Sequence, residues 1–354
     1  MTDRLAAHED FWLRKVCQQP LVSFRIGDTL VARHFAAAQH LLVDRTRVTP
    51  DMIVVDDFLA DYERMWTTAQ DIGQSGIWTG EPYTGIPWME AILGCDVYGT
   101  ASSFVTEPCV NTLEDLEHVR LNPENPWLLK YLEFTRKLEA LSAGRFPVGE
   151  PIMRGPSDVV GALVGQTSMI FLMNDCAEAM AGVFERIGAI FQSVIRAQQR
   201  LEQPYLGGHS FGFYHLWAPG RCIWFQEDLS ALLSPDYYRQ FLRAADDVIC
   251  AGYDYTLIHV HPSSFFIVPD LLANEGLRAI EVNKDVGGPS VEDMLPTLRR
   301  VQEKKNLVMW GEITVEDVGL LMDRLPERRM HLSIVSPSVD YAKRILDLIN
   351  KKTT

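Results

Sequence analysis

Two histidines stand two positions apart at the end of an apolar stretch, TLIHVH at 256–261. Alternate side chains of a strand point to the same face, so His259 and His261 should lie side by side. Glu281 follows 20 residues after His261, at the end of the next apolar stretch. Two imidazoles and one carboxylate can hold Zn²⁺ or another divalent metal such as Fe²⁺, with a position left for water or substrate. The spacing therefore predicts a metal site formed by these three side chains.

Two other chemistries fit the same residues. Paired imidazoles also serve as a catalytic acid and base, or as interior groups satisfied by hydrogen bonds. Glu281 could instead form an ion pair with Arg25 or Arg154, because a buried carboxylate needs a partner. We expect His259 and His261 to be catalytic residues whether they bind a metal or act as an acid and a base.

Other polar and aromatic side chains follow the ends of the remaining predicted strands. Charged groups at such positions are costly to bury unless they are paired, so some of them should face a ligand. His215 and Asp228 have the chemistry of a general base and of a group that orients substrate. The expected substrate-binding residues are Arg25, Trp78, Glu81, Arg154, Trp217, Gln226, Asn283 and Trp310.

The elements that must position these residues are clearest in the C-terminal third. Short stretches rich in β-branched residues recur there about every 25 residues, at 256–261, 278–283, 307–312 and 331–335. Helical patterns lie between them. Ser290 with Asp293 and Thr314 with Asp317 have capping-box spacing, and Ser338 can cap the last helix. Strand, loop and capped helix in alternation predict a parallel sheet.

Upstream, the pattern is looser but continues. Further strands are expected at 20–26, 75–80, 150–156, 211–219 and 222–225, and a helix at 234–252. About eight strands alternating with helices predict a (βα)8 TIM barrel, in which the carboxyl ends of the strands build the site. We expect one domain over residues 1–354, with helical additions around 27–75 and 107–148. An open, doubly wound sheet is the alternative.

Composition narrows the classes of partner. The chain has 354 residues and a net charge of −14, so duplex nucleic acid and anionic membrane surfaces are not expected to bind. The charged N-terminal residues lack a signal peptide's apolar core, which favours a cytoplasmic location. The six cysteines include no C-x-x-C pair, as is typical of reduced thiols. Neither G-x-G-x-x-G nor a P-loop follows a predicted strand, so no nucleotide cofactor is expected.

The order of several motifs adds a resemblance to a known family. The segments that carry it are PLVSFR, GIPWMEAILGC, LSALLSPDYYRQF, IHVHPSS, IEVNKD and IVSPSVDYAKRIL, which begin at positions 20, 85, 229, 258, 280 and 334. Their order resembles the uroporphyrinogen decarboxylase superfamily, a TIM-barrel superfamily. The resemblance is closer to its zinc-dependent methyltransferases, which take methyl groups from or to corrinoid proteins, thiols or folates, than to true uroporphyrinogen decarboxylases.

The resemblance implies a metal centre with an altered ligand set. In the methyltransferases, zinc is held by His-x-Cys, at times by an acidic residue further on, and by a late cysteine. At the matching positions this chain has His259, His261 in place of the thiol, Glu281, and Ser336 near the late cysteine. The arginine-rich loop with which true decarboxylases grip substrate carboxylates is absent after Arg25. The resemblance also implies a corrinoid protein as a partner and, as in many members, a homodimer.

Three functions follow as hypotheses. The first is metal-assisted methyl transfer that involves a small methylated substrate, a folate or a corrinoid protein. The second is cofactor-free decarboxylation of a porphyrinogen-like or smaller carboxylate, with Arg25 or Arg154 holding the acid. The third is a non-catalytic protein that binds a ligand or a corrinoid. Metal content separates the first hypothesis from the other two.

Overall fold

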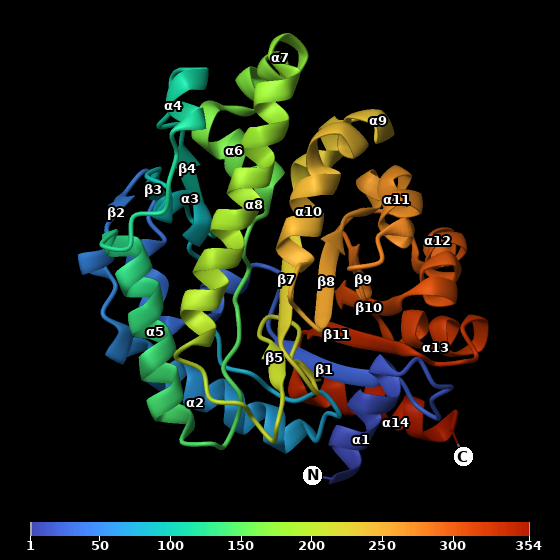
Figure 1. Cartoon of the computed structure of the whole chain (residues 1–354). Helices are drawn as coiled ribbons and strands as arrows, with labels where there is room; N and C mark the ends of the chain where they lie inside the picture. The colour runs from blue at the N-terminus through green and yellow to red at the C-terminus, as the bar shows by residue number, and fades with distance from the viewer. Residues whose placement is uncertain (1, 354) are drawn as a thin grey trace.

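A curled sheet of six parallel strands forms the centre of the computed structural model, which describes residues 2–353 (Figure 1). The strand order is β1-β11-β10-β9-β8-β7. The bounds are β1 Leu21–Ile26, β7 Cys222–Gln226, β8 Tyr255–Val260, β9 Ala279–Lys284, β10 Asn306–Gly311 and β11 Met330–Ser336. These strands confirm six of the stretches expected from the sequence, each within two residues at either end.

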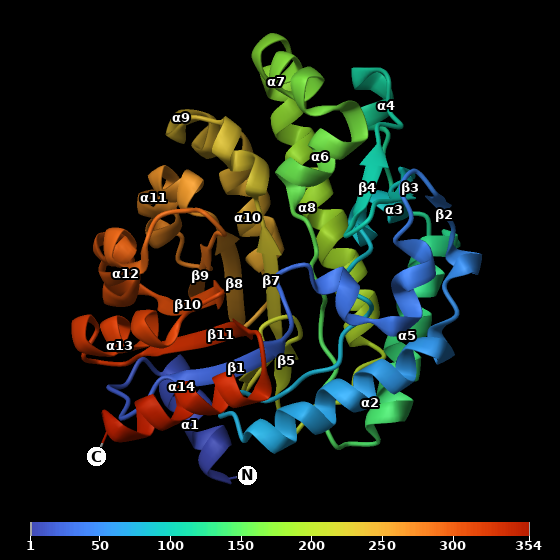
Figure 2. The same cartoon turned by 180° about the vertical axis from the view of Figure 1, so that it is seen from behind.

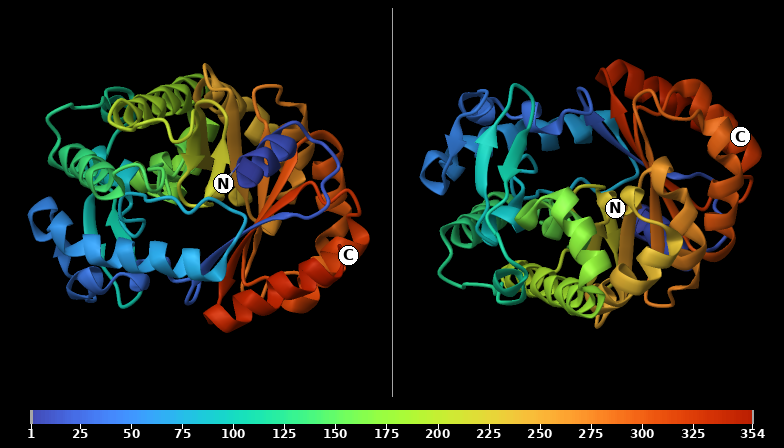
Figure 3. Two further views of the ribbon diagram at one scale, coloured as in Figure 1. Left: turned by 90° about the horizontal axis from the view of Figure 1, so that it is seen from below. Right: turned by 90° about the horizontal axis from the view of Figure 1, so that it is seen from above.

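Alternate residues of each strand face two different cores. On β1, Val22 and Phe24 belong to the large cluster that the outer helices cover, whereas Leu21 belongs to a second cluster inside the curl. The strands are apolar on both faces for this reason, as expected for a parallel sheet. The helices that follow the C-terminal strands lie outside the curl (Figure 3); they are α10 Arg243–Cys250, α11 Val268–Ala273, α12 Val291–Lys304, α13 Val315–Arg324 and α14 Val339–Lys351.

The predicted helix starts are confirmed. Ser290 and Thr314 each accept a hydrogen bond from the backbone N–H three residues later, and Asp293 and Asp317 complete the two capping boxes. Ser338 caps α14 in the same way through the backbone N–H of Tyr341. These caps mark where each helix begins, and therefore where the loop after each strand ends.

Two expected strands are not regular strands. The segments 75–80 and 150–156 contribute only isolated parallel bridges, Gly80 with Val148 and Arg154 with Gln226. The backbone N–H of Gly76 also donates to the carbonyl of Val22 on β1, at 2.7 Å. The gap between the two sheet edges, β1 and β7, is thus spanned by extended chain with few ladder bonds. A regular eight-stranded barrel stays a prediction.

The expected strand at 211–219 is wrong. The chain folds there into an antiparallel hairpin, with β5 (His209–Phe211) paired to β6 (Leu216–Ala218). Phe213 and Tyr214, in its turn, join the cluster inside the curl. Helix α1 (Thr2–Trp12) packs on β6 and β1, and the Trp12 indole donates to the carbonyl of Trp217 at 2.8 Å. The residues here form an apolar run, without the alternation of apolar and polar residues that is typical of a half-exposed strand. The hairpin can therefore be buried inside the curl.

The additions contain more than helices. Residues 27–75 form η1 (Val31–His34), η2 (Ala36–Leu41), β2 (Arg47–Val48), η3 (Pro50–Met52) and α2 (Val55–Ile72). Strand β2 joins β3 (Asp96–Gly99) and β4 (Phe104–Glu107) in a small antiparallel sheet that the sequence patterns did not indicate. Figure 2 shows this sheet beside the ends of α6 and α8, away from the large sheet.

The remaining helices form the half of the molecule opposite the C-terminal helices (Figures 1 and 2). They are α3 Trp88–Ile92, α4 Leu113–Glu117, α5 Pro126–Ser142, α6 Pro156–Val164, α7 Gln166–Asp175 and α8 Ala177–Gln199. The helix expected at 234–252 is interrupted: α9 (Pro235–Tyr237) passes through a π-helical turn, η5 (Tyr238–Leu242), before α10. Short 3₁₀ turns η4 (Asp228–Leu232) and η6 (Pro262–Ile267) follow β7 and β8. No helix within residues 2–353 is long and apolar enough to cross a membrane.

Candidate metal centre

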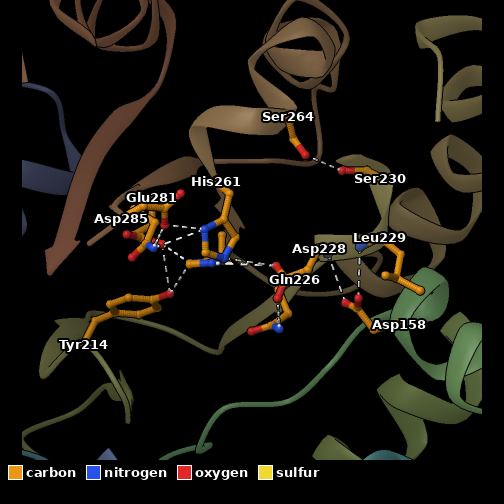
Figure 4. A network of polar contacts seen from close by, with 12 residues as sticks. Asp158, Tyr214, Gln226, Asp228, Leu229, Ser230, His261, Ser264, Glu281 and Asp285 are labelled. Atoms are coloured by element: carbon orange, nitrogen blue, oxygen red, sulfur yellow. Dashed lines mark hydrogen bonds and ion pairs between the residues drawn. The ribbon is translucent and has the colours of Figure 1, made fainter. Parts of the chain in front are cut away.

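Three neighbouring strands end at the candidate site. The register pairs Gln226 of β7 with His259 of β8, and His259 with Glu281 of β9. Because parallel strands in register place paired residues in one row, these side chains meet inside the curl at the carboxyl ends of the strands. His261 follows β8 and its ring lies 4.6 Å from that of His259, at an interplanar angle of 84° (Figure 4).

His259 is held on its inner side by a buried carboxylate. Its Nδ1 is in close contact with Oε2 of Glu281, which is fully buried. The hydroxyl of Tyr214 donates to the same oxygen at 3.2 Å. Burial lowers the pKa of His259, but the Glu281 carboxylate, followed by Asp228, outweighs burial and raises it to about 9. With Nδ1 engaged by Glu281, Nε2 is the nitrogen that remains to face outward.

His261 is oriented in a similar way. Its Nδ1 donates to Oδ1 of Asp285 at 2.6 Å, and the side-chain amide of Asn283 lies 3.2 Å from the same nitrogen. Asn283 also donates to Asp285, which ties the end of β9 to the loop that follows it. Each histidine therefore has a carboxylate on Nδ1 and presents Nε2 to Asp228. This is the outer-ligand arrangement that orients imidazoles around metals in proteins.

Both outward nitrogens face one oxygen of Asp228. The Asp228 Oδ1 atom lies 3.7 Å from Nε2 of His259 and 3.8 Å from Nε2 of His261. These three ligand atoms lie within 4.8 Å of one another, the one such group of three found among residues 2–353. That Oδ1 is buried without a hydrogen-bond partner, while Oδ2 accepts from the Gln226 amide at 2.6 Å. Glu281 lies on the far nitrogen of His259, so Asp228 is the third candidate ligand.

A second carboxylate fixes Asp228 in place. Asp158, at the start of α6, accepts hydrogen bonds from the backbone N–H groups of Asp228 (3.1 Å) and Leu229 (3.0 Å). Burial, and then the charge of Asp228, raise the pKa of Asp158 well above its usual value. Figure 4 shows Asp158 on the opposite side of Asp228 from His261. The position of the candidate ligand is thus set by α6, which sequence patterns alone do not connect to β7.

A cavity of about 460 Å³ opens beside Asp228. Asp158, Arg154 and Gly161 line it, together with residues 104–106 of β4. Arg154 donates to the fully buried Glu90 at 2.8 Å and keeps 39% of its side chain exposed. The Glu90 carboxylate raises the pKa of Arg154 above its usual value, so this cationic group stays charged at the cavity wall. A substrate of moderate size therefore has room next to Asp228.

Most of the other expected site residues are divided between two places. Gln226 and Asn283 support Asp228 and His261, and Arg154 lies at the same cavity. Four of them line or adjoin a different cavity beside β1; they are Arg25, Trp78, Glu81 and His215.

The two remaining tryptophans lie elsewhere. Trp217 is buried at the amino end of the sheet, where its indole donates to the carbonyl of Tyr205. It packs there because the predicted strand is a hairpin, which directs Trp217 away from the carboxyl ends. Trp310 on β10 packs against the ring of Phe213, with centroids 5.3 Å apart.

Tyr214 is a site residue that the sequence did not point to. Its hydroxyl lies 3.4 Å from His259 Nδ1 as well as 3.2 Å from Glu281. It comes from the hairpin turn, so no strand-end position marked it. Only the insertion of the hairpin into the curl brings its ring to β8 and β9.

Comparisons with known proteins show the fold of this chain but give no match at the level of sequence. No family model and no curated protein matches the sequence. Among solved structures, a methyltransferase from Methanosarcina mazei is similar over 99% of this chain and 98% of its own, with a TM-score of 0.62 and 15% identity. A B12-independent methionine synthase from Shewanella sp. W3-18-1, in complex with selenomethionine, is similar over 95% of this chain and 97% of its own, with a TM-score of 0.55 and 10% identity. The chain therefore shares the fold of these two enzymes over nearly its whole length.

Proposed function

We propose that this protein is a metal-dependent methyltransferase whose metal is held by Asp228, His259 and His261. The observation that carries the proposal is the convergence of both Nε2 atoms on the unpartnered Asp228 Oδ1, with carboxylates behind both imidazoles. The fold is shared with two enzymes named as a methyltransferase and a methionine synthase. We also infer that the extended segments between β1 and β7 complete a distorted eight-stranded barrel around this site.

The spacing of the donor atoms suits a small divalent metal. Ligand atoms about 2.1 Å from a tetrahedral Zn²⁺ stand about 3.4 Å apart. The separations of 3.7 and 3.8 Å between Asp228 Oδ1 and the two nitrogens need a contraction of a few tenths of an ångström. Two nitrogens and one oxygen leave a fourth position of a tetrahedral metal for water or substrate. A metal bound there would supply Lewis acidity to a substrate heteroatom.

The surrounding residues have separate tasks in this proposal. Glu281 and Asp285 hold the imidazole orientation, and Asp158 holds the Asp228 backbone. Arg154 provides a fixed positive charge at the cavity wall, suited to an anionic part of the substrate or of a partner. The proposed substrate is a small methylated compound, and the proposed methyl acceptor is a corrinoid carried by a protein partner.

Metal content is the first test. Protein purified without chelators is expected to hold one equivalent of Zn²⁺ or another divalent transition metal by plasma mass spectrometry. His261→Ala should lose most of it, whereas His40→Ala, at an exposed histidine outside the site, should retain it. Wild-type protein that takes up no metal when incubated with Zn²⁺ would rule out the proposed centre.

Methyl transfer is the second test. Free cob(I)alamin is supplied as acceptor and small methylated amines, thiols and methanol as donors, and loss of the cob(I)alamin absorbance is followed. In the balanced reaction the methyl carbon leaves its heteroatom, which gains a proton, and bonds to cobalt. His261→Ala should abolish the reaction. Release of CO₂ from carboxylic acids by metal-free protein would instead support the decarboxylase hypothesis.

A further inference from the structure

A second cavity, of about 220 Å³, lies beside β1 and away from Asp228. Strand β1, helix α2, the segment around Trp78 and the start of α14 enclose it. Its apolar walls include Ile26, Met65, Ile72 and Trp78. A cavity of about 150 Å³ is enough to hold benzene, so this one can take a single ring with a short substituent. We call it the side cavity.

His215 supplies one polar group to the side cavity. Its Nδ1 accepts a hydrogen bond from the backbone N–H of Thr79 at 3.1 Å, which leaves Nε2–H as the donor of the neutral ring. Burial, and then the charge of Arg25, lower the pKa of His215 well below its usual value. Trp78 stacks on this ring, with centroids 5.8 Å apart and planes at 29°. His215 also has a left-handed φ of 55°, a conformation that non-glycine residues rarely adopt.

Arg25 supplies the charge. Its Nη2 donates both to Oε1 of Glu81 at 3.1 Å and to the carbonyl of Phe213 at 3.2 Å. Its Nε and Nη1 make no hydrogen bond to any residue between 2 and 353. Burial raises the pKa of Glu81 to about 7 against the opposing effect of Arg25. Glu81 engages only Nη2 of the guanidinium, so the Nε–H and Nη1–H donors stay available to a second anionic group.

These groups together define a ligand. An apolar enclosure with a buried cation at one end and an N–H donor beside it fits a small molecule with an apolar ring and one anionic oxygen group. We propose that the side cavity binds a small aromatic or branched-aliphatic monocarboxylate, with its carboxylate on Arg25 and His215 and its apolar part against Met65, Ile72 and Trp78.

The side cavity is separate from the candidate metal centre. Residues 213–215 of the hairpin turn stand between the two: the Phe213 carbonyl binds Arg25, the Tyr214 hydroxyl binds Glu281, and the His215 ring lines the side cavity. A ligand there does not approach Asp228. The inference goes beyond methyl transfer and does not depend on it.

Two adjacent threonines of α2 offer a matched test. Thr68 lines the side cavity, whereas Thr67 is exposed and does not. Isothermal titration calorimetry with phenylacetate should show binding to wild-type protein and to Thr67→Phe. Thr68→Phe should raise the dissociation constant at least tenfold, about 1.4 kcal/mol. Ala69→Leu, which fills the cavity from a neighbouring position, should act in the same direction.

The chemistry of the probe supplies the second comparison. Phenylacetamide has the same shape without the charge, and should bind at least tenfold more weakly than phenylacetate. His261→Ala should leave phenylacetate binding intact, because that side chain belongs to the other site. Binding that survives Thr68→Phe would place phenylacetate outside the side cavity, and binding lost in His261→Ala would place it at the metal centre; either result would overturn the proposal. So would the absence of phenylacetate binding to wild-type protein.

Discussion

The buried carboxylate of Glu281 decides how His259 can be used. Glu281 contacts Nδ1 and keeps a proton on that nitrogen, so Nε2, which faces Asp228, is the nitrogen that a metal would engage after displacing its proton. Asp285 does the same for His261. Sequence spacing placed Glu281 in the right neighbourhood but did not say which nitrogen it would meet. That depended on the side-chain torsions of the packed site.

Glu281→Gln is expected to weaken metal binding without removing a candidate ligand. The amide is nearly isosteric but is a weaker acceptor from Nδ1–H, so the imidazole becomes a poorer ligand. Loss of such an outer partner costs about 10- to 100-fold in metal affinity. Competition with a chromogenic chelator measures the effect, with Glu275→Gln at an exposed glutamate as the control. Unchanged affinity in Glu281→Gln would contradict the assigned role.

Two cysteines that are 14 residues apart in sequence meet in the fold. The Sγ atoms of Cys95 and Cys109 are 3.6 Å apart, with Cys95 buried and Cys109 exposed. The hydrogen bond from the Cys95 thiol lowers the pKa of Cys109, which favours its thiolate. Diamide should take two electrons and two protons from this pair and lower the protein mass by about 2 Da. Cys95→Ala should abolish that mass change; its persistence would point to a different pair.

At the scale of elements, the helix caps show what local sequence can predict, and the hairpin shows what it cannot. The capping boxes at Ser290 and Thr314 were predictable because each depends on residues three positions apart. The hairpin at 209–218 was not, because its apolar run fits a strand as well as a buried turn. Its position inside the curl brings Tyr214 to the site and leaves Trp217 at the opposite end.

Ser290→Ala should lower the free energy of unfolding by about 1 kcal/mol, the usual cost of removing an N-cap. The hydroxyl satisfies the backbone N–H of Asp293 at the start of α12 and also donates to the Asp293 carboxylate. Urea unfolding should show a lower midpoint with an unchanged slope. Thr67→Ala, in the middle of α2, removes an exposed hydroxyl that caps nothing and should cause no loss.

At the scale of the whole molecule, burial of ionisable groups links stability to pH in two directions. His8 and His331 are fully buried, and burial lowers their pKa values to about 4 and about 3. Such groups stabilise the fold above pH 6.5 and lose that contribution as the pH falls. Glu81 and Asp246, whose pKa values burial raises to about 7, act in the opposite sense and lose their contribution as the pH rises.

His8→Gln isolates one of these contributions. In the wild type, the unfolded chain protonates His8 below about pH 6.5 while the folded chain does not, so acid should cost about 2 kcal/mol at this site between pH 7.5 and 5. The free energy of unfolding is measured by urea titration at both pH values. From pH 7.5 to 5 it should fall by about 2 kcal/mol less in His8→Gln than in the wild type. An identical pH dependence in the two proteins would show that His8 is protonated in the fold.

The sequence by itself determined the parts that depend on near neighbours along the chain. The C-terminal strands, their capped helices and the positions of His259, His261 and Asp228 at strand ends all follow from periodicities and short spacings. Tertiary structure decided which of these groups face one another. The register of β7, β8 and β9, the bonds from Asp158 on α6 and the hairpin turn at Tyr214 together direct Asp228 toward both imidazoles and separate Arg25 and His215 into a second cavity. These contacts join residues about 20 to 190 positions apart, so no local pattern encodes them. Packing and burial select among side-chain directions only once the whole fold is formed.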